Sequence, residues 1–494
     1  MARPAILAVD LGTGSVRAGL VGPSGRLLCL SSVPHETSFP RHGWVEQRPE
    51  DWWSGAVLAI RGAMSEAPDD VELRALVACG QMHAPVLVDA GGRLTADTVP
   101  LWNDKRAAQL VADLTTDRTA RLRDVANPMT TAWPGIKLAW MTANAPQVLE
   151  RARWLLMPKD YLNFRLTGLA AMDWTEAGSS VLADMAGGVW SPDLAAALGV
   201  PFGLLPPLLP SHAQLGRLLP GVAEEIGLPA HLPVLVGAGD FPAAMLGSGV
   251  AETGQVSDIT GTSFLLTRLV DTPFRHPQVM NVATASGHWG AFAVVDAAGD
   301  AIRWAARTLD GNRSRFEDLS RAAEAVPAGA EGLVFMPYLT GERLGQGSKS
   351  RAHFLGLTAQ HGPAHLHRAV MEGVVLAMQE AFAPVREALP VSTIRSSAGG
   401  ARSDLWLQIK ADVFGVPILP TREPEAGLLG CAMLALTGAG EFGSLAEAAR
   451  HLVSYRDPVE PDPARRLRYA DLAAAYAELR VVSPTLNESL GRLS

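Results

Sequence analysis

The segment Ala5-Ile-Leu-Ala-Val-Asp-Leu-Gly-Thr-Gly-Ser15 joins a short apolar run to a turn rich in glycine and hydroxyl side chains. Residues 16–21 resume a strand pattern, and Pro23-Ser-Gly25 then turns the chain into a third strand at 26–31. Tight hairpins of this kind favour antiparallel strands, whereas a Rossmann unit would continue into a helix. The first 35 residues are therefore predicted to form a β-meander.

A similar segment recurs in the second half of the chain. Asp258-Ile-Thr-Gly-Thr-Ser263 resembles Asp10-Leu-Gly-Thr-Gly-Ser15, and about half of the 494-residue chain separates them. One strand–turn–strand unit per half favours two related domains that face each other, although one short repeat can also arise by chance. We expect a boundary near residue 245, with domains at 1–245 and 246–494.

Strand and helix patterns alternate along the rest of the chain, which favours the α/β class. The sequence predicts strands at 73–79 and 233–239, helices at 51–64, 365–383 and 404–414, and a Pro-rich, charged surface loop at 450–468. For the helix at 404–414, Ser403 is the expected N-cap and Gly415 the residue that ends it.

The composition excludes several classes of protein. Hydrophobic residues make up 48% and charged residues 19%, which is normal for a globular chain with a buried core. The net charge of −8 argues against a nucleic-acid partner, because no basic stripe is present to neutralise phosphates. The three cysteines lack CxxC spacing, and no apolar stretch is long enough to span a membrane. With no recognisable signal peptide, we expect a cytoplasmic protein.

The turn at 10–15 has residue types that suit a phosphate and a metal ion. Glycines let the backbone approach an anion, hydroxyls can hold its oxygens, and an aspartate at a strand end can bind Mg²⁺. The alternative is an ordinary hairpin turn, in which these residue types are also common. Neither the third glycine of the Rossmann fingerprint nor a Walker A loop is present, so a nucleotide site here must be of another type.

Three other segments carry polar side chains after predicted strands or before a helix. Asp240 follows Gly237-Ala-Gly239 and could accept a hydroxyl proton, or could be an Asx-turn or N-cap residue. Gly80-Gln-Met-His83 could contact a polyol, with a buried core histidine as the alternative. Ser397-Ala-Gly-Gly-Ala-Arg-Ser403 could hold adenosine or a phosphate at a helix N-terminus, or could be a plain strand-to-helix turn.

Taken together, the segments resemble the FGGY family of carbohydrate kinases, and within it the xylulokinases most closely. The resemblance runs from residue 5 to about residue 440 in the family's order. Its most specific part is His353-Phe-Leu-Gly-Leu357 followed, after seven residues, by His365-Leu-x-x-Ala369-Val-Met-Glu372. Further similar motifs are Trp44-Val-Glu-Gln47, Leu101-Trp-Asn-Asp104, Trp133-Pro-Gly-Ile-Lys137-Leu-Ala-Trp140, Met157-Pro-Lys-Asp-Tyr161 and Pro337-Tyr-Leu-x-Gly-Glu-Arg343.

The resemblance implies an α/β, two-domain, actin/hexokinase-like (ribonuclease H-like) fold with a deep interdomain cleft. It implies that the N-terminal domain binds the sugar and carries the Mg²⁺/phosphate loop, and that the C-terminal domain binds ATP. Asp240 would be the catalytic base and, with Asp10, a metal ligand. Gln81, Met82, His83 and Asp240 would bind the sugar. The residues implied to bind ATP are Gly12, Thr13, Gly14, Ser15, Thr260, Gly261, Thr262, Gly399, Gly400, Ala401 and Ser403.

The implied activity is the ATP- and Mg²⁺-dependent phosphorylation of a small sugar or polyol, with conversion of D-xylulose to D-xylulose 5-phosphate as the leading expectation. Phe241 departs from the xylulokinase pattern, because a small or amide residue usually follows the base there and contacts the sugar. Ribulose, glycerol, a tetritol and gluconate therefore stay open as substrates. The other functions considered are a non-catalytic sugar- or nucleotide-binding regulator and an ATPase machine. Dimers are common in the family, so a homodimer is possible.

Overall fold

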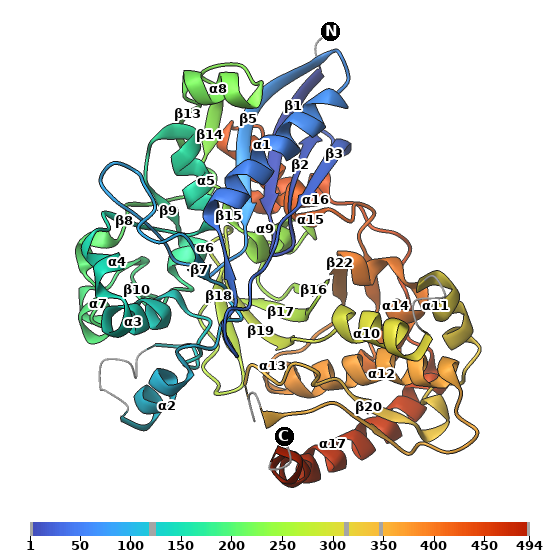
Figure 1. The fold of residues 1–494 in the computed structure, drawn as a ribbon. Coiled ribbons are helices and arrows are strands. Elements are labelled where there is room, and N and C mark those ends of the chain that lie inside the picture. Colours follow the sequence, from blue (N-terminus) through green and yellow to red (C-terminus); the bar gives the residue numbers. More distant parts are fainter. Residues whose placement is uncertain (1–2, 118–124, 311–315, 345–348, 492–494) are drawn as a thin grey trace.

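The computed structural model describes residues 3–117, 125–310, 316–344 and 349–491 of the chain. Two mixed sheets organise these residues, one in each half of the sequence, and helices cover both sheets (Figure 1). The chain is an α/β protein of two domains, as predicted.

The first sheet has the order β13-β14-β5-β1-β2-β3, and β15 also pairs with β5. β1, β2 and β3 are antiparallel, so the predicted meander is confirmed. On the other side β5 pairs with β1, and β14 with β5, in parallel. The strands are β1 (Arg3–Leu11), β2 (Ser15–Val21), β3 (Leu27–Pro34), β5 (Val71–Gly80), β13 (Gln214–Arg217), β14 (Pro233–Leu235) and β15 (Ala238–Gly239).

The second sheet has the order β18-β19-β17-β16-β22-β23. Here too an antiparallel hairpin, β16–β17, is extended by a third antiparallel strand on one side and by parallel strands on the other. Both predicted strand–turn–strand segments therefore occupy the same place in their sheets. The strands are β16 (Val256–Thr260), β17 (Phe264–Val270), β18 (Met280–Ala283), β19 (Trp289–Val295), β22 (Ile394–Ser397) and β23 (Ile418–Pro420).

Helices pack on the first sheet from both of its faces. α1 (Pro49–Ser65) covers β2 and β3, while α9 (Asp240–Gly247) and α15 (Ala426–Gly438) pack together against the other face, with α16 (Leu445–Leu452) beyond them. α15 and α16 come from the C-terminal part of the chain, so one face of the first sheet is covered by helices that are distant in sequence. Figure 1 shows these orange-red helices beside the blue strands.

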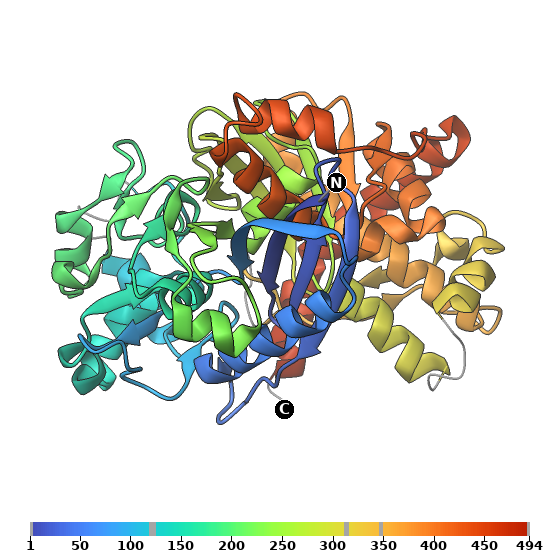
Figure 2. The same ribbon diagram turned by 90° about the horizontal axis from the view of Figure 1, so that it is seen from above.

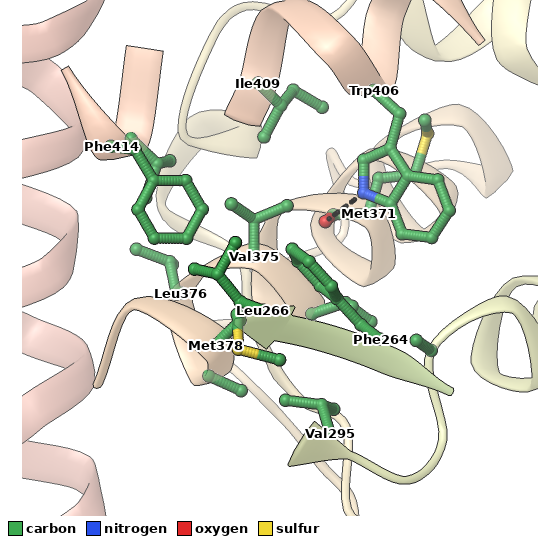
Figure 3. Packing of buried hydrophobic residues seen from close by; sticks show 14 of the residues in the cluster. Phe264, Leu266, Val295, Met371, Val375, Leu376, Met378, Trp406, Ile409 and Phe414 are labelled. Atoms are coloured by element: carbon green, nitrogen blue, oxygen red, sulfur yellow. Dashed lines mark hydrogen bonds between the residues drawn. The ribbon is translucent and has the colours of Figure 1, made fainter. Parts of the chain in front are cut away.

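The core of the second half lies between its sheet and the helices α10 (Gly299–Asp310), α12 (Pro363–Ala381) and α14 (Asp404–Phe414). Figure 3 shows Phe264 and Leu266 of β17 packed against Met371 and Val375 of α12, and the Trp406 indole N–H donating to the Met371 carbonyl at 3.2 Å. The α14 prediction is confirmed, including both of its ends: the Ser403 hydroxyl accepts the Trp406 N–H, and Gly415 is left-handed at φ 69°.

Short elements between β3 and β13 lie against and beside the first sheet, blue to green toward the left of Figures 1 and 2. They are β4 (Glu46–Gln47), β6 (Val86–Val88), β7 (Val99–Pro100), α2 (Ala108–Asp117), α3 (Pro134–Asn144), α4 (Pro146–Glu150), β8 (Trp154–Leu156), α5 (Pro158–Thr167), β9 (Met172–Asp173), α6 (Trp174–Ala177), β10 (Ala183–Asp184), β11 (Val189–Trp190), α7 (Pro192–Ala197) and β12 (Leu208–Leu209). α8 (Pro220–Ile226) follows β13. The C-terminal half adds α11 (Phe316–Glu324), β20 (Val334–Met336), β21 (His353–Leu355), α13 (Ala383–Ala388) and α17 (Pro463–Gly491).

Two sequence predictions need correction. The expected strand at 233–239 is two strands, because Gly237 turns at φ 74° and its backbone lies too close to the Ala78 carbonyl for any side chain. The expected loop at 450–468 is wrong at both ends, since α16 runs to Leu452 and α17 begins at Pro463. The Asp462 carboxylate accepts the N–H groups of the first turn of α17, and a proline is favourable at that position of a helix.

Candidate active site

Three parallel strands of the first sheet end side by side at the candidate site. Leu11 of β1 is in register with Gly80 of β5, and Gly80 is in register with Gly239 of β15. In sheets of this kind the ligand-binding residues gather at the carboxyl ends of the strands. The ends of these three strands therefore bring Asp10, the segment 81–83 and Asp240 to one edge of the sheet.

Asp240 is the first residue of α9, and its carboxylate is partly buried. Its Oδ1 accepts the N–H of the next residue, Phe241, at 2.7 Å, and the N-cap of α9 is Gly239, so Asp240 is not the N-cap or Asx-turn residue of the alternative prediction. Burial raises the pKa of Asp240 to about 8, and the neighbouring charge of Asp10 adds to the rise. A carboxyl with such a pKa can exchange a proton near neutral pH, as a general base must.

Asp10 lies near enough to Asp240 for its charge to act on that carboxylate. Among the described residues, its buried Oδ1 has no hydrogen-bond partner. Burial raises the pKa of Asp10, while the Arg17 charge opposes that rise. Two adjacent carboxylates repel each other unless a proton or a cation lies between them, so this pair has the donor chemistry that Mg²⁺ uses.

A metal site made only of protein ligands is not present in the part of the chain that the structure describes, since no three His, Cys, Asp or Glu side chains are arranged to hold an ion. Mg²⁺ commonly binds one or two carboxylates and takes its other ligands from water and substrate phosphates. Asp10 and Asp240 therefore fit a Mg²⁺ ion that arrives with a nucleotide.

Met82 and His83 follow the end of β5, and Met82 packs against the residue before Asp240. The Met82 sulfur packs on Gly239, where a Cβ would come within 2.7 Å of it. His83 has a left-handed backbone at φ 70°, an uncommon conformation for a residue with a side chain that is often found at functional sites. Burial lowers the pKa of His83 well below its usual value, so the imidazole is neutral.

Lys137, from the Trp133–Trp140 motif, holds the strained His83 in place. The Lys137 ammonium is 1% exposed and donates to the carbonyls of His83 and Ala132, both at 2.7 Å. The His83 ring packs edge-on against the Trp133 ring, with centroids 5.2 Å apart. His83 is thus a fixed, neutral hydrogen-bonding group beyond the end of β5, and its buried Nδ1 has no partner among the described residues.

Gln81 is the first residue after β5, and its side chain is buried. It is 1% exposed and donates to the Gln47 Oε1 at 2.8 Å, and Gln47 in turn donates to the Thr13 carbonyl at 2.7 Å. A direct contact of Gln81 with the sugar stays a prediction. Sequence reasoning gave Gln47 no role, although it lies in one of the family-like motifs.

The turn at 12–15 is a genuine hairpin, closed by the Gly12 N–H donating to the Ser15 carbonyl at 3.1 Å. The hairpin does not exclude a phosphate loop, because Gly14 is exposed at its tip. Trp102 donates from its indole N–H to the Thr13 hydroxyl at 3.2 Å, which fixes one side of the loop. Sequence reasoning quoted Trp102 in a motif without giving it a role.

The predicted ATP segments of the second sheet also come together. β16 and β22 are parallel, with Ile259 in register with Ser397, so the loops that follow them are neighbours. A Cβ on Gly400 would lie 2.5 Å from the Thr260 Cβ, so only glycine permits this approach. Ala398 takes the left-handed φ of 64°, and Gly261 and Thr262 are exposed.

Asp10 and Asp258 hold the same position in the two similar segments, but their surroundings differ. Asp258 is fully buried, and its Oδ2 lies 2.7 Å from the ammonium of Lys410, which also donates to the Thr260 hydroxyl at 3.0 Å. Asp258 is thus neutralised within the protein, whereas the buried Asp10 Oδ1 has no hydrogen-bond partner among the described residues. Lys410 lies on α14, far along the chain, and no motif marked it.

Two further residues contact the loop after β16, which is one of the predicted ATP segments. Arg303 of α10 donates to the Thr262 hydroxyl at 3.2 Å, and Gly299 packs so closely on the Gly261 carbonyl that a Cβ would lie 2.2 Å from it. Sequence reasoning missed both, because they belong to a helix start without a phosphate-binding pattern.

Contacts join the two halves around the site. Glu425 pairs with Arg17 of β2 at 3.0 Å and lies 3.7 Å from Arg402 in the glycine-rich loop after β22. Phe241 packs edge-on against Phe292 of β19, with centroids 5.3 Å apart. The Phe241 ring therefore contacts the second sheet.

Comparison with known proteins gives the family. Residues 5–247 match the N-terminal domain of the FGGY family of carbohydrate kinases, and residues 257–439 match its C-terminal domain. The chain belongs to the FGGY family of carbohydrate kinases. It is 30% identical to the xylulose kinase of Bacillus subtilis over 98% of both chains. It is 32% identical to that of Escherichia coli, over 96% of this chain and 98% of that protein.

A solved structure supports the same assignment. The xylulose kinase from Rhodospirillum rubrum is 28% identical, with a TM-score of 0.86 over 97% of this chain and 99% of that one. The expected actin/hexokinase-like fold is confirmed, the protein is a carbohydrate kinase, and the family implies ATP as its phosphate donor. No helix within the described residues is both long and apolar enough to cross a bilayer.

Proposed function

We propose that this carbohydrate kinase transfers the γ-phosphoryl group of ATP to D-xylulose, giving D-xylulose 5-phosphate. The observation that carries the proposal is the pair of adjacent carboxylates, Asp10 and Asp240, with the pKa of Asp240 raised to about 8. Extensive similarity to proteins named xylulose kinase supports the choice of sugar.

In this proposal Asp240 accepts the proton of the sugar hydroxyl as its oxygen attacks the γ-phosphorus. The new O–P bond forms while the bond to the bridging oxygen of ADP breaks, and the proton stays on Asp240. Asp10 and Asp240 would hold Mg²⁺, which supplies neutralisation of phosphate charge when bound. Most of the remaining work is alignment, because phosphoryl transfer depends mainly on positioning and electrostatics.

Protein groups would align the two substrates from opposite sheets. Gln81, Met82 and His83 would contact the sugar. Backbone and hydroxyl groups of the turn at 12–15, of 260–262 and of 399–401 would hold the nucleotide. Ser403 caps α14 through its hydroxyl, so its contribution would be to present the N-terminus of that helix.

We also propose domains at 1–245 and 246–494, a cytoplasmic location and a homodimer. The domain division is supported by the gap between the two family matches, at 248–256. A reducing compartment is supported by three free cysteines, Cys29, Cys79 and Cys431.

The pH dependence of the reaction follows from the pKa of Asp240. A base is active only when deprotonated, so kcat/KM should rise with pH on the acidic side and level off near the pKa of about 8. A cation beside the carboxylate favours its ionised form, so kcat at saturating Mg·ATP should level off at lower pH. Rates measured from about pH 5 to pH 10 test this. A flat kcat/KM profile across that range would show that Asp240 titrates as an ordinary aspartate.

A substrate panel tests the proposed function. ADP release is measured at saturating Mg·ATP with D-xylulose, D-ribulose, glycerol, a tetritol and D-gluconate, and without any acceptor. We expect the highest kcat/KM with D-xylulose. A higher kcat/KM with another acceptor would mean that this acceptor, and not D-xylulose, is the substrate. Acceptor-independent release would indicate an ATPase, and no release with any acceptor would favour a binding protein.

A further inference from the structure

The turn that leads into Asp240 is held by side chains and backbone from three other segments. Asn163 of α5 donates from its amide to the Val236 carbonyl at 2.8 Å. The Gly237 N–H donates to the Ser211 carbonyl at 2.9 Å, and the Gly239 N–H donates to the Thr175 hydroxyl at 2.9 Å. The last of these hydrogen bonds lies one residue before the proposed base.

Thr175 is suited to hold that N–H in one direction. Its side chain is fully buried in α6, and its hydroxyl hydrogen is donated to the Asp173 Oδ2 at 2.7 Å. Because a carboxylate oxygen only accepts, the Thr175 oxygen lone pair is left facing the Gly239 N–H. The orientation of the hydroxyl is therefore fixed by its two partners.

Asp173 is in turn fixed by a buried polar cluster. Its Oδ2 also accepts the Thr175 N–H at 3.0 Å and the Ser211 hydroxyl at 2.7 Å, and its Oδ1 lies 3.1 Å from the ammonium of Lys159. Asp173 and Lys159 are both fully buried. The Asp173 Oδ2 thus accepts three hydrogen bonds and its Oδ1 faces a buried ammonium, so Asp173 is held from both sides and its movement would cost these partners.

We propose that Thr175 is a positioning residue for Asp240: through the Gly239 N–H it transmits the rigidity of the Asp173–Lys159 cluster to the turn that aims the base. The inference rests on the proposed role of Asp240. Reaction rates are sensitive to small errors in alignment, and a displacement of about 1 Å can cost on the order of 10²-fold in rate.

The test compares two substitutions at one position. Thr175→Val keeps the shape and removes the hydroxyl, so kcat should fall by about 10–100-fold while the KM for ATP stays within about twofold. Thr175→Ser keeps the hydroxyl and should retain activity within about threefold of wild type. If the valine variant does not fold, as judged by its melting temperature, Thr175→Ala takes its place.

A matched control separates positioning from general damage to the core. Thr284 is also buried, and its hydroxyl accepts a backbone N–H, that of His288 at 3.2 Å, in the β18–β19 hairpin. Thr284→Val should keep near-normal kcat. If it loses as much kcat as Thr175→Val, deletion of any buried hydroxyl is damaging and the positioning role is wrong.

The double variant gives the sharpest result. If Thr175 acts through Asp240, adding Thr175→Val to Asp240→Asn should cause little further loss of kcat, whereas an independent structural effect would add to it. Normal kcat in Thr175→Val, or full additivity with Asp240→Asn, would overturn the positioning role of Thr175 and leave the proposed function intact. Normal turnover by Asp240→Asn itself instead overturns the proposed function.

Discussion

Replacing Asp240 by asparagine is expected to lower kcat by at least 10²–10⁴-fold, the usual contribution of a general base. Asparagine has nearly the same shape and can still accept the Phe241 N–H, but it cannot take up the hydroxyl proton. Nucleotide binding should persist, because the loops proposed to hold ATP lie mainly on the second sheet. The measurements are steady-state kcat with D-xylulose and the Kd of Mg·ADP by calorimetry.

Asp193→Asn is the matched control for this substitution. Asp193 is exposed in the first turn of α7, and its replacement should leave both kcat and the Kd of Mg·ADP unchanged. Near-normal turnover by Asp240→Asn would reject Asp240 as the base. A loss of kcat accompanied by an equal loss of Mg·ADP binding would show that holding Mg²⁺, the other role proposed for Asp240, accounts for the effect and that it is not the base.

Asp10→Asn is expected to have the second large effect. Charge neutralisation by a bound metal ion contributes several kcal/mol to such reactions, so weakening its ligand should lower kcat by about 10²–10³-fold and raise the Mg²⁺ concentration needed for half-maximal rate. Asp70→Asn, in an exposed pair with Arg3, is the control. An unchanged Mg²⁺ requirement would show that Asp10 does not hold the ion.

Asp10→Asn should also shift the pH dependence of kcat/KM in a defined direction. The charge of Asp10 helps to raise the pKa of Asp240, so its removal should lower that pKa and shift the acidic limb of kcat/KM to lower pH. The shift is measured on the residual activity. A limb that stays in place would mean that burial alone sets the pKa of Asp240.

Local patterns in the sequence predicted much of the fold and the outline of the site. The hairpin at 10–15 and the helix at 404–414 were predictable because their turn, capping and periodicity signals are carried by neighbouring residues. Asp10, Met82, His83 and Asp240 were predictable as candidates because each lies at, or just after, the end of a strand.

The groups that hold these residues in place were not predictable in the same way. Lys410 pairs with Asp258 across 152 positions, and Thr175 holds Gly239 across 64. Such contacts depend on how distant segments pack, and a buried Lys or Thr has no local signal of its partner. The break at Gly237 was hidden for the same reason, since its cause is the Ala78 carbonyl of a neighbouring strand.

The destination of the terminal phosphate of ATP tests the central claim most directly. ATP labelled in its γ-phosphate is incubated with Mg²⁺, the wild-type protein and D-xylulose, and the labelled products are separated. The account predicts one labelled sugar phosphate for each ADP formed, and very little label transfer by Asp240→Asn. Label released as inorganic phosphate at the same rate with and without sugar would contradict it.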